Sequence, residues 1–169
     1  MAKADLSVIG VNGGNRPFRV AASATRGYAG EPMIWPGTLS SGIASVNTIT
    51  VMPDARPVVG TDNLVGISSK DMAVNSAGTV TAQTVYVTTL IPQATRVRGK
   101  AKTAASVDTD SELLGLLWDV VLFDLTSSVY TIDETGAADT SGLIIVDGDI
   151  TKGTLDVVVD VRSFRADVS

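Results

Sequence analysis

The chain has 169 residues, which is enough for one domain with a hydrophobic core that needs neither disulfides nor a metal. Its net charge of −5 argues against nucleic-acid binding, because phosphate neutralisation normally needs a basic surface. Cysteine and histidine are both absent, which excludes disulfides, thiolate nucleophiles, Cys-ligated zinc and the commonest general base near neutral pH. We therefore expect a protein that is not an enzyme and that holds no cofactor or metal.

Apolar residues make up 44% of the chain but aromatic residues only 5%. The core must therefore consist mainly of Val, Ile, Leu and Ala, and the β-branched residues among them favour strands. The most apolar stretch, residues 113–125, is interrupted by Asp119 and Asp124 and is too short to span a bilayer. No apolar run follows residues 1–5, so we expect a soluble protein without a secretory signal.

Residues 1–36 form the first predicted unit. Glycines and prolines recur through this segment with arginines between them, and its apolar residues show no sustained period. The pattern predicts an extended N-terminal arm with a short strand at residues 6–11. Its apolar residues indicate that the arm lies on a surface, either that of its own domain or that of a partner.

Residues 37–169 form the second predicted unit, in which short strands recur with turn signals between them. The predicted strands cover residues 48–51, 64–67, 79–82, 84–91, 96–102, 143–146 and 155–161. Asp147-Gly148 is a strong hairpin-turn dipeptide after the sixth of these strands. Strands spaced this closely predict an all-β domain, a small antiparallel β-barrel or β-sandwich.

One segment of the second unit is predicted to be helical. Residues 110–112 can cap a short helix that runs to Leu117, and Val120-Val121 predict a strand directly after it. The same acidic run resembles the start of a calcium loop, but Leu113 stands where an EF-hand requires glycine. Helix capping explains these residues better, so we expect one short helix and no metal site.

Six carboxylates are candidates for acid–base chemistry: Asp119, Asp124, Asp133, Glu134, Asp156 and Asp160. A general acid needs a pKa raised by burial. Asp156 and Asp160 alternate with a face of Leu and Val, so we expect both side chains to point into water. The sequence therefore assigns no catalytic residue.

A row of cations is the most ordered polar feature of the sequence. The two-residue period of a strand places Arg96, Arg98, Lys100 and Lys102 on one face. Such a row can dock on an acidic protein surface, where charge governs association rate and register. It can equally be a charged solvent face that prevents sheets from aggregating, and the sequence leaves both interpretations open.

Three stretches of the chain resemble tailed-bacteriophage capsid decoration (cement) proteins. They are Glu31-Pro32-Met33-Ile34-Trp35-Pro36-Gly37 at the end of the arm, residues 96–102 leading into 106–115, and residues 152–162. The resemblance implies a small β-barrel or sandwich on the outside of an assembled head, made in the host cytoplasm and located in the virion. It also implies trimers or sometimes dimers, with N-terminal arms that become ordered on the capsid lattice.

On this interpretation the partners are the major capsid protein and further copies of the chain, with no nucleic acid and no membrane. The expected contact residues are the four cations at 96–102 and, because they lie in the arm, Arg16, Arg19, Arg26 and Trp35. An alternative is another virion component, such as a tail or fibre-associated protein. Long fibres usually show repeats or heptads, which this sequence lacks.

Overall fold

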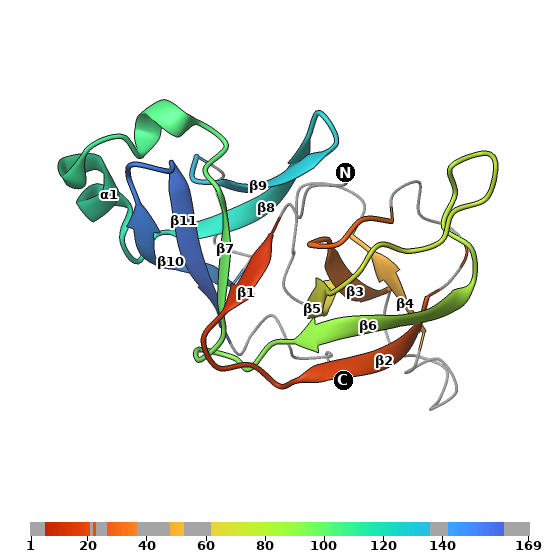
Figure 1. Cartoon of the computed structure of the whole chain (residues 1–169). Coiled ribbons are helices and arrows are strands. Elements are labelled where there is room, and N and C mark those ends of the chain that lie inside the picture. The colour runs from red at the N-terminus through yellow and green to blue at the C-terminus, as the bar shows by residue number, and fades with distance from the viewer. Residues whose placement is uncertain are drawn as a thin grey trace.

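The computed structural model describes residues 6–20, 22, 27–36, 48–52, 62–135 and 142–160. In this part of the chain, strands form a six-stranded sheet and a closed barrel, and the one α-helix is short (Figure 1). The predicted all-β fold with at most one short helix is therefore confirmed.

The closed barrel contains five consecutive strands of the chain. They are β2 (Asn15–Val20), β3 (Pro32–Pro36), β4 (Thr48–Val51), β5 (Asp62–Ser68) and β6 (Gln83–Thr89). Their order around the barrel is β2-β4-β3-β5-β6, and only the β2–β4 pair is parallel. Closure of the barrel removes sheet edges that would otherwise offer unpaired backbone groups.

The six-stranded sheet combines the first strand of the chain with the last five. Its order is β1 (Ser7–Ile9), β7 (Arg96–Lys100), β11 (Thr154–Val159), β10 (Leu143–Asp149), β8 (Val120–Thr126) and β9 (Val129–Asp133), with every neighbouring pair antiparallel. The sheet curls so that Ala101, the residue after β7, forms a parallel bridge with Ile132 of β9.

The segment predicted as an arm contributes strands to both sheets. β1 pairs with β7, while β2 and β3 are two of the five barrel strands. The described part of residues 1–36 is therefore built into the sheets of its own chain. The physical reason is that β1 to β3 place their backbone N–H and C=O groups in ladders, which supplies partners that a free arm would find only in water or on a partner.

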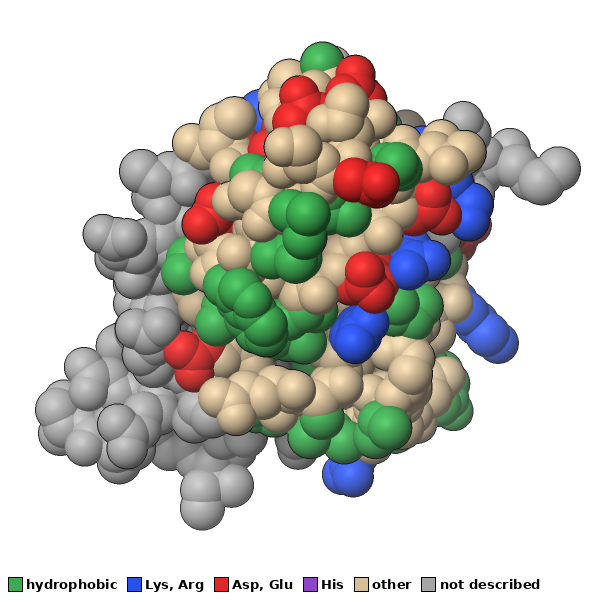
Figure 2. Space-filling model, turned by 90° about the vertical axis from the view of Figure 1, so that its left-hand side faces the viewer, with side chains coloured by type: hydrophobic (Ala, Val, Ile, Leu, Met, Phe, Trp, Pro, Cys, Tyr) green, Lys and Arg blue, Asp and Glu red, His purple; other side chains and the backbone are tan. Residues whose placement is uncertain are grey.

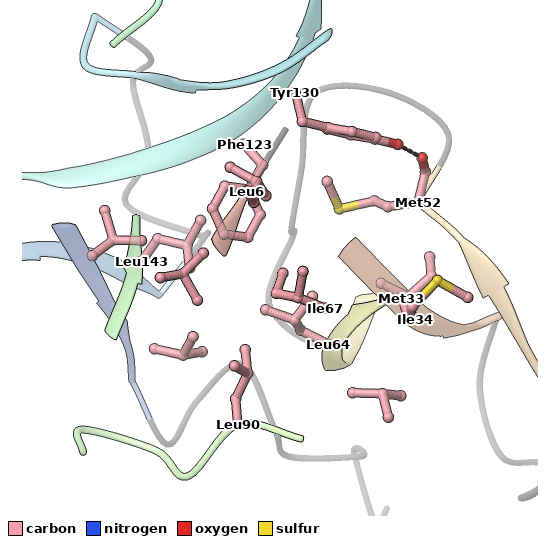
Figure 3. Packing of buried hydrophobic residues seen from close by; sticks show 14 of the residues in the cluster. Leu6, Met33, Ile34, Met52, Leu64, Ile67, Leu90, Phe123, Tyr130 and Leu143 are labelled. Carbon is pink, nitrogen blue, oxygen red and sulfur yellow. Dashed lines mark hydrogen bonds between the residues drawn. The ribbon is translucent and has the colours of Figure 1, made fainter. Parts of the chain in front are cut away.

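The barrel and the curled sheet share one hydrophobic core. The buried cluster includes Leu64 and Met33 from the barrel and Phe123 and Leu143 from the sheet (Figure 3). Leu6, the residue just before β1, belongs to the same cluster. Direct bonds also join the two parts. The Leu6 N–H donates to the Gly30 carbonyl at 3.1 Å, and the buried Tyr130 hydroxyl donates to the Met52 carbonyl. The two parts therefore pack as one body.

The helix α1 (Asp110–Leu116) begins as the acidic residues predicted. Thr109 is its N-cap and forms a capping box with Glu112, in which each side chain accepts from the other residue's backbone N–H. The helix is brief and β8 follows it, which confirms the predicted order. Leu113 packs against β10 beside Gly148, where a Cβ would lie 2.8 Å from Leu113 Cδ1.

The predicted turn at Asp147-Gly148 is wrong. Both residues lie inside β10, which continues to Asp149, and a bulge between Ile145 and Asp147 shifts the register. The chain turns over residues 150–153 instead, and Gly153 has a positive φ of 58°. Gly148 is needed for close approach to α1 and β11, which explains a glycine there without a turn.

Candidate protein-docking surfaces

The cations of β7 lie on one face of the strand, as predicted. Arg96 and Lys100 are exposed and Arg98 is half-buried, whereas Val97 and Gly99 face the core. Gly99 is close-packed there, since a Cβ would lie 2.6 Å from Leu6 Cδ2. The two-residue period therefore identified both the strand and its orientation.

Arg98 is bound by a carboxylate of the neighbouring strand. Its Nε donates to Asp156 Oδ1 at 2.6 Å and its Nη2 to Asp156 Oδ2 at 2.8 Å, a bidentate pair. The Asp156 side chain is only 1% exposed, so the expectation that it points into water is wrong. Alternation placed it away from the apolar face of β11, but Arg98 lies directly across on β7 and covers it. The hydrogen bond and charge of Asp156 raise the pKa of Arg98.

The outer two cations of the strand also have partners within the chain. Arg96 Nη1 lies 3.1 Å from Asp147 Oδ2 on β10, and both side chains are about half exposed. Lys100 Nζ donates to the Lys152 carbonyl at 2.5 Å. Lys152 Nζ in turn lies 2.8 Å from Asp149 Oδ2, so this end of β7 is connected to the β10–β11 turn.

Lys102 joins the end of β7 to the far edge of the curled sheet. Its Nζ lies 2.7 Å from Asp133 Oδ2 on β9 and 3.3 Å from Asp124 Oδ2 on β8. The bond to Asp133 raises the pKa of Lys102, against the opposing effect of burial. Burial pushes the pKa of Asp133 upward, but hydrogen bonds from Lys102 and Thr135 outweigh it, and the pKa is lowered.

Glu134 completes this junction. It accepts the backbone N–H groups of Lys102 at 3.1 Å and Thr103 at 3.0 Å. Asp133 and Glu134, two of the six candidate carboxylates, therefore hold the curl of the sheet together. All four cations of residues 96–102 thus bind groups of the same chain. Their bonds connect β7 and the residues just after it to other strands and to the β10–β11 turn.

Arg16 and Arg19 are exposed on β2 but lie on opposite faces of that strand. Arg19 is level with Thr84 of β6, and Arg16 is level with Val87, which faces the barrel interior. Arg16 Nε donates to the Gly13 carbonyl at 3.3 Å. The two arginines are therefore not brought together in one binding surface.

Trp35 belongs to the barrel instead of a free arm. It is half-buried on β3, packs against the core cluster, and meets Phe18 edge-to-face with ring centroids 6.4 Å apart. Arg26, the remaining predicted contact, lies outside the described residues.

Among the described residues, the most exposed large apolar side chains lie on a different surface. Trp118 is 72% exposed and Leu114 is 68% exposed, on the segment that runs from α1 into β8. The Trp118 backbone is held firmly, because its N–H donates to the Ile145 carbonyl of β10 at 2.9 Å. Figure 2 looks onto the α1 side of the molecule and shows hydrophobic side chains gathered there, with acidic side chains above them and both acidic and basic side chains beside them.

We call this surface the Trp118 face and define it by Leu114, Trp118 and three exposed carboxylates, Asp110, Glu112 and Asp119. The sequence signal for it was ambiguous. Leucines 113, 114, 116 and 117 followed by Trp118 suggest a helix buried in the core, yet α1 has no fully buried residue. A helix of only seven residues turns Leu113 toward β10 and leaves Leu114 facing out.

Within the described residues, no three acidic side chains gather closely enough to hold a metal ion. None of the helices described there is long and apolar enough to cross a membrane. Comparisons of the sequence with models of known families and with curated proteins find no match.

Proposed function

We propose that this chain is a structural virion protein that binds the outside of an assembled phage capsid and cements neighbouring major capsid subunits. The observation that best supports the proposal is the Trp118 face, which presents a tryptophan and a leucine to solvent on a firmly held backbone. Tryptophan is enriched among residues that dominate protein interfaces. Apolar patches rimmed by polar residues are typical of protein–protein contact.

The ion pairs of the curled sheet suit a mechanical role. Bonds from β7 reach β11 and β10, and bonds from Lys102, two residues after β7, reach β8 and β9, so load applied at one strand is shared with the others. A cement protein must hold adjacent subunits against internal pressure, and many modest contacts on a repeated lattice give high avidity. In this proposal the chain acts as a homo-oligomer, a trimer or a dimer, bound to several subunits at once.

Co-sedimentation tests the proposal. The purified chain is mixed with expanded, empty shells assembled from the major capsid protein of the phage that encodes it, and bound chain is measured in the pellet. We expect saturable binding and shells that break at a higher temperature than bare shells. A chain that stays in the supernatant at every concentration contradicts the proposal. The light-scattering mass of the chain, relative to 17.4 kDa for one copy, tests the oligomer separately.

A further inference from the structure

The charges of the chain are distributed unevenly along its length. Residues 91–160 contain 12 Asp and Glu but 5 Lys and Arg, a net charge of −7, whereas residues 1–90 contain 5 acidic and 6 basic residues, a net charge of +1. The first range includes five of the six strands of the curled sheet, and the second includes the whole barrel. The sheet half is therefore the strongly acidic half of the molecule.

Internal ion pairs leave the remaining acidity concentrated at the Trp118 face. The cations at 96, 98, 102 and 152 are paired with Asp147, Asp156, Asp133, Asp124 and Asp149. Among the described residues, no cation lies within ion-pair distance of Asp110, Glu112 or Asp119. All three are exposed and lie between positions 110 and 119 of the sequence, the stretch that also contains Leu114 and Trp118.

The backbone at Trp118 is strained. Its φ is +75°, a left-handed conformation that is unusual for a bulky residue. Glycine would adopt this conformation at lower cost, so the tryptophan is held there at the expense of stability. Such outliers cluster at sites whose side chains have a role beyond packing.

We propose that the Trp118 face docks on a protein surface that offers an apolar socket for Trp118, ringed by Lys and Arg side chains. The inference rests on the function proposed above, and the partner surface is therefore on the outside of the major capsid protein. Charge complementarity supports this occupant, because the exposed carboxylates of the Trp118 face steer a basic partner and reject an acidic one. A second copy of the chain docked face to face would oppose carboxylates to carboxylates, which is unfavourable.

The first test compares two exposed aromatic residues in the co-sedimentation assay. Trp118→Ala removes the anchor, and Tyr86→Ala is the matched control, since Tyr86 is 49% exposed on the barrel strand β6. We expect Trp118→Ala to weaken shell binding about tenfold or more, and Tyr86→Ala to leave it within about twofold. Leu114→Ser provides a second variant with the same expected direction, and thermal melts check that each variant is folded.

The outcomes separate the two proposals. Wild-type chain that fails to bind shells overturns the proposed function and this inference together. Wild-type binding that Trp118→Ala and Leu114→Ser leave unchanged overturns only this inference. A large loss with Tyr86→Ala alone would place the contact on the barrel and would also overturn it.

The second test examines the charge of the partner. Asp110→Asn with Asp119→Asn removes two carboxylates from the face, and Asp147→Asn with Asp149→Asn removes two that already have cationic partners. We expect the first double variant to bind shells several-fold more slowly at low salt and to lose most of the salt dependence of association. The second should retain that dependence. Equal effects of the two, or faster binding by the first, would contradict a basic partner surface.

Discussion

Arg98 and Asp156 lie opposite each other on β7 and β11 and form a bidentate ion pair at 2.6 and 2.8 Å. The two residues are 58 positions apart in the sequence, and the aspartate is almost fully buried while about a third of the arginine side chain is exposed. The arginine therefore covers a charge that the sheet has removed from water. Loss of this ion pair should therefore cost a different free energy from loss of the exposed Arg96–Asp147 pair next to it.

Removal of Arg98 should destabilise the fold far more than removal of Arg96. Arg98→Ala leaves the Asp156 carboxylate buried without its main partner, and we expect a loss of about 2–3 kcal/mol in the free energy of unfolding. This is less than for a fully buried pair, because solvent reaches Arg98. Arg96→Ala breaks a pair exposed on both sides and should cost less than about 1 kcal/mol. Urea denaturation measures both, and similar losses would show that burial of Asp156 does not set the cost.

The Lys102–Asp133 pair should make stability depend on acid pH. The lowered pKa of Asp133 means that its contribution is complete above the unfolded value of about 4 and is lost as pH falls through the folded value. The raised pKa of Lys102 keeps the pair intact up to its ordinary value of 10.5 and beyond. The melting temperature should therefore fall below about pH 4. Lys102→Met should melt lower than wild type at pH 7 and show a smaller further loss in acid; an unchanged acid limb would argue against the pair.

Two glycines should respond to alanine in opposite directions. A Cβ on Gly66 of β5 would overlap the Thr88 carbonyl oxygen and lie 2.7 Å from Val87 Cγ1, so Gly66→Ala should cost about 2 kcal/mol or more. Gly115 in α1 has open space where its Cβ would lie, so Gly115→Ala should stabilise by about 0.5 kcal/mol through helix propensity. Chemical denaturation checks both, and a neutral Gly66→Ala would mean that β5 and β6 can move apart.

The left-handed backbone at residue 118 predicts an order of stability among its variants. Glycine adopts a φ of +75° without the Cβ penalty, so Trp118→Gly should be more stable than Trp118→Ala by about 0.5–1 kcal/mol. The greater freedom of glycine in the unfolded chain reduces this difference but does not reverse it. Parallel thermal melts measure it. An alanine variant at least as stable as the glycine variant would show that residue 118 relaxes to an ordinary conformation.

The sequence predicted those features that depend on neighbours along the chain. The alternation at 96–102 gave the strand and its inward face, and the acidic residues at 110–112 gave the start of α1. The partners of the cations were not predictable, because Asp156 and Asp133 are brought to them by strand pairing across long separations. Asp156 also shows that the alternation of apolar and polar residues predicts on which side of a strand a side chain lies. Whether that side chain is buried depends on what covers that side.

Two other features were not predictable from the sequence for similar reasons. β2 contains Pro17 between exposed arginines, a composition typical of a loop, so its pairing with β6 could not be predicted from the sequence. The Trp118 face was hidden within the most apolar part of the sequence. Hydrophobic residues there suggest a core, but α1 has only seven residues, none of them fully buried, and Leu114 and Trp118 are largely exposed.

The pairing of β1 with β7 has a consequence for how the chain folds. Ile9 is level with Arg96, so the whole barrel is inserted between two strands that are direct neighbours in the sheet. In effect β1 and β7 are the arms of a hairpin whose connecting loop is itself a folded barrel. Loop closure over so many residues is slow unless the intervening chain is already compact. Formation of the barrel brings the two arms together, so we expect β1 to pair with β7 only after the barrel strands between them have paired.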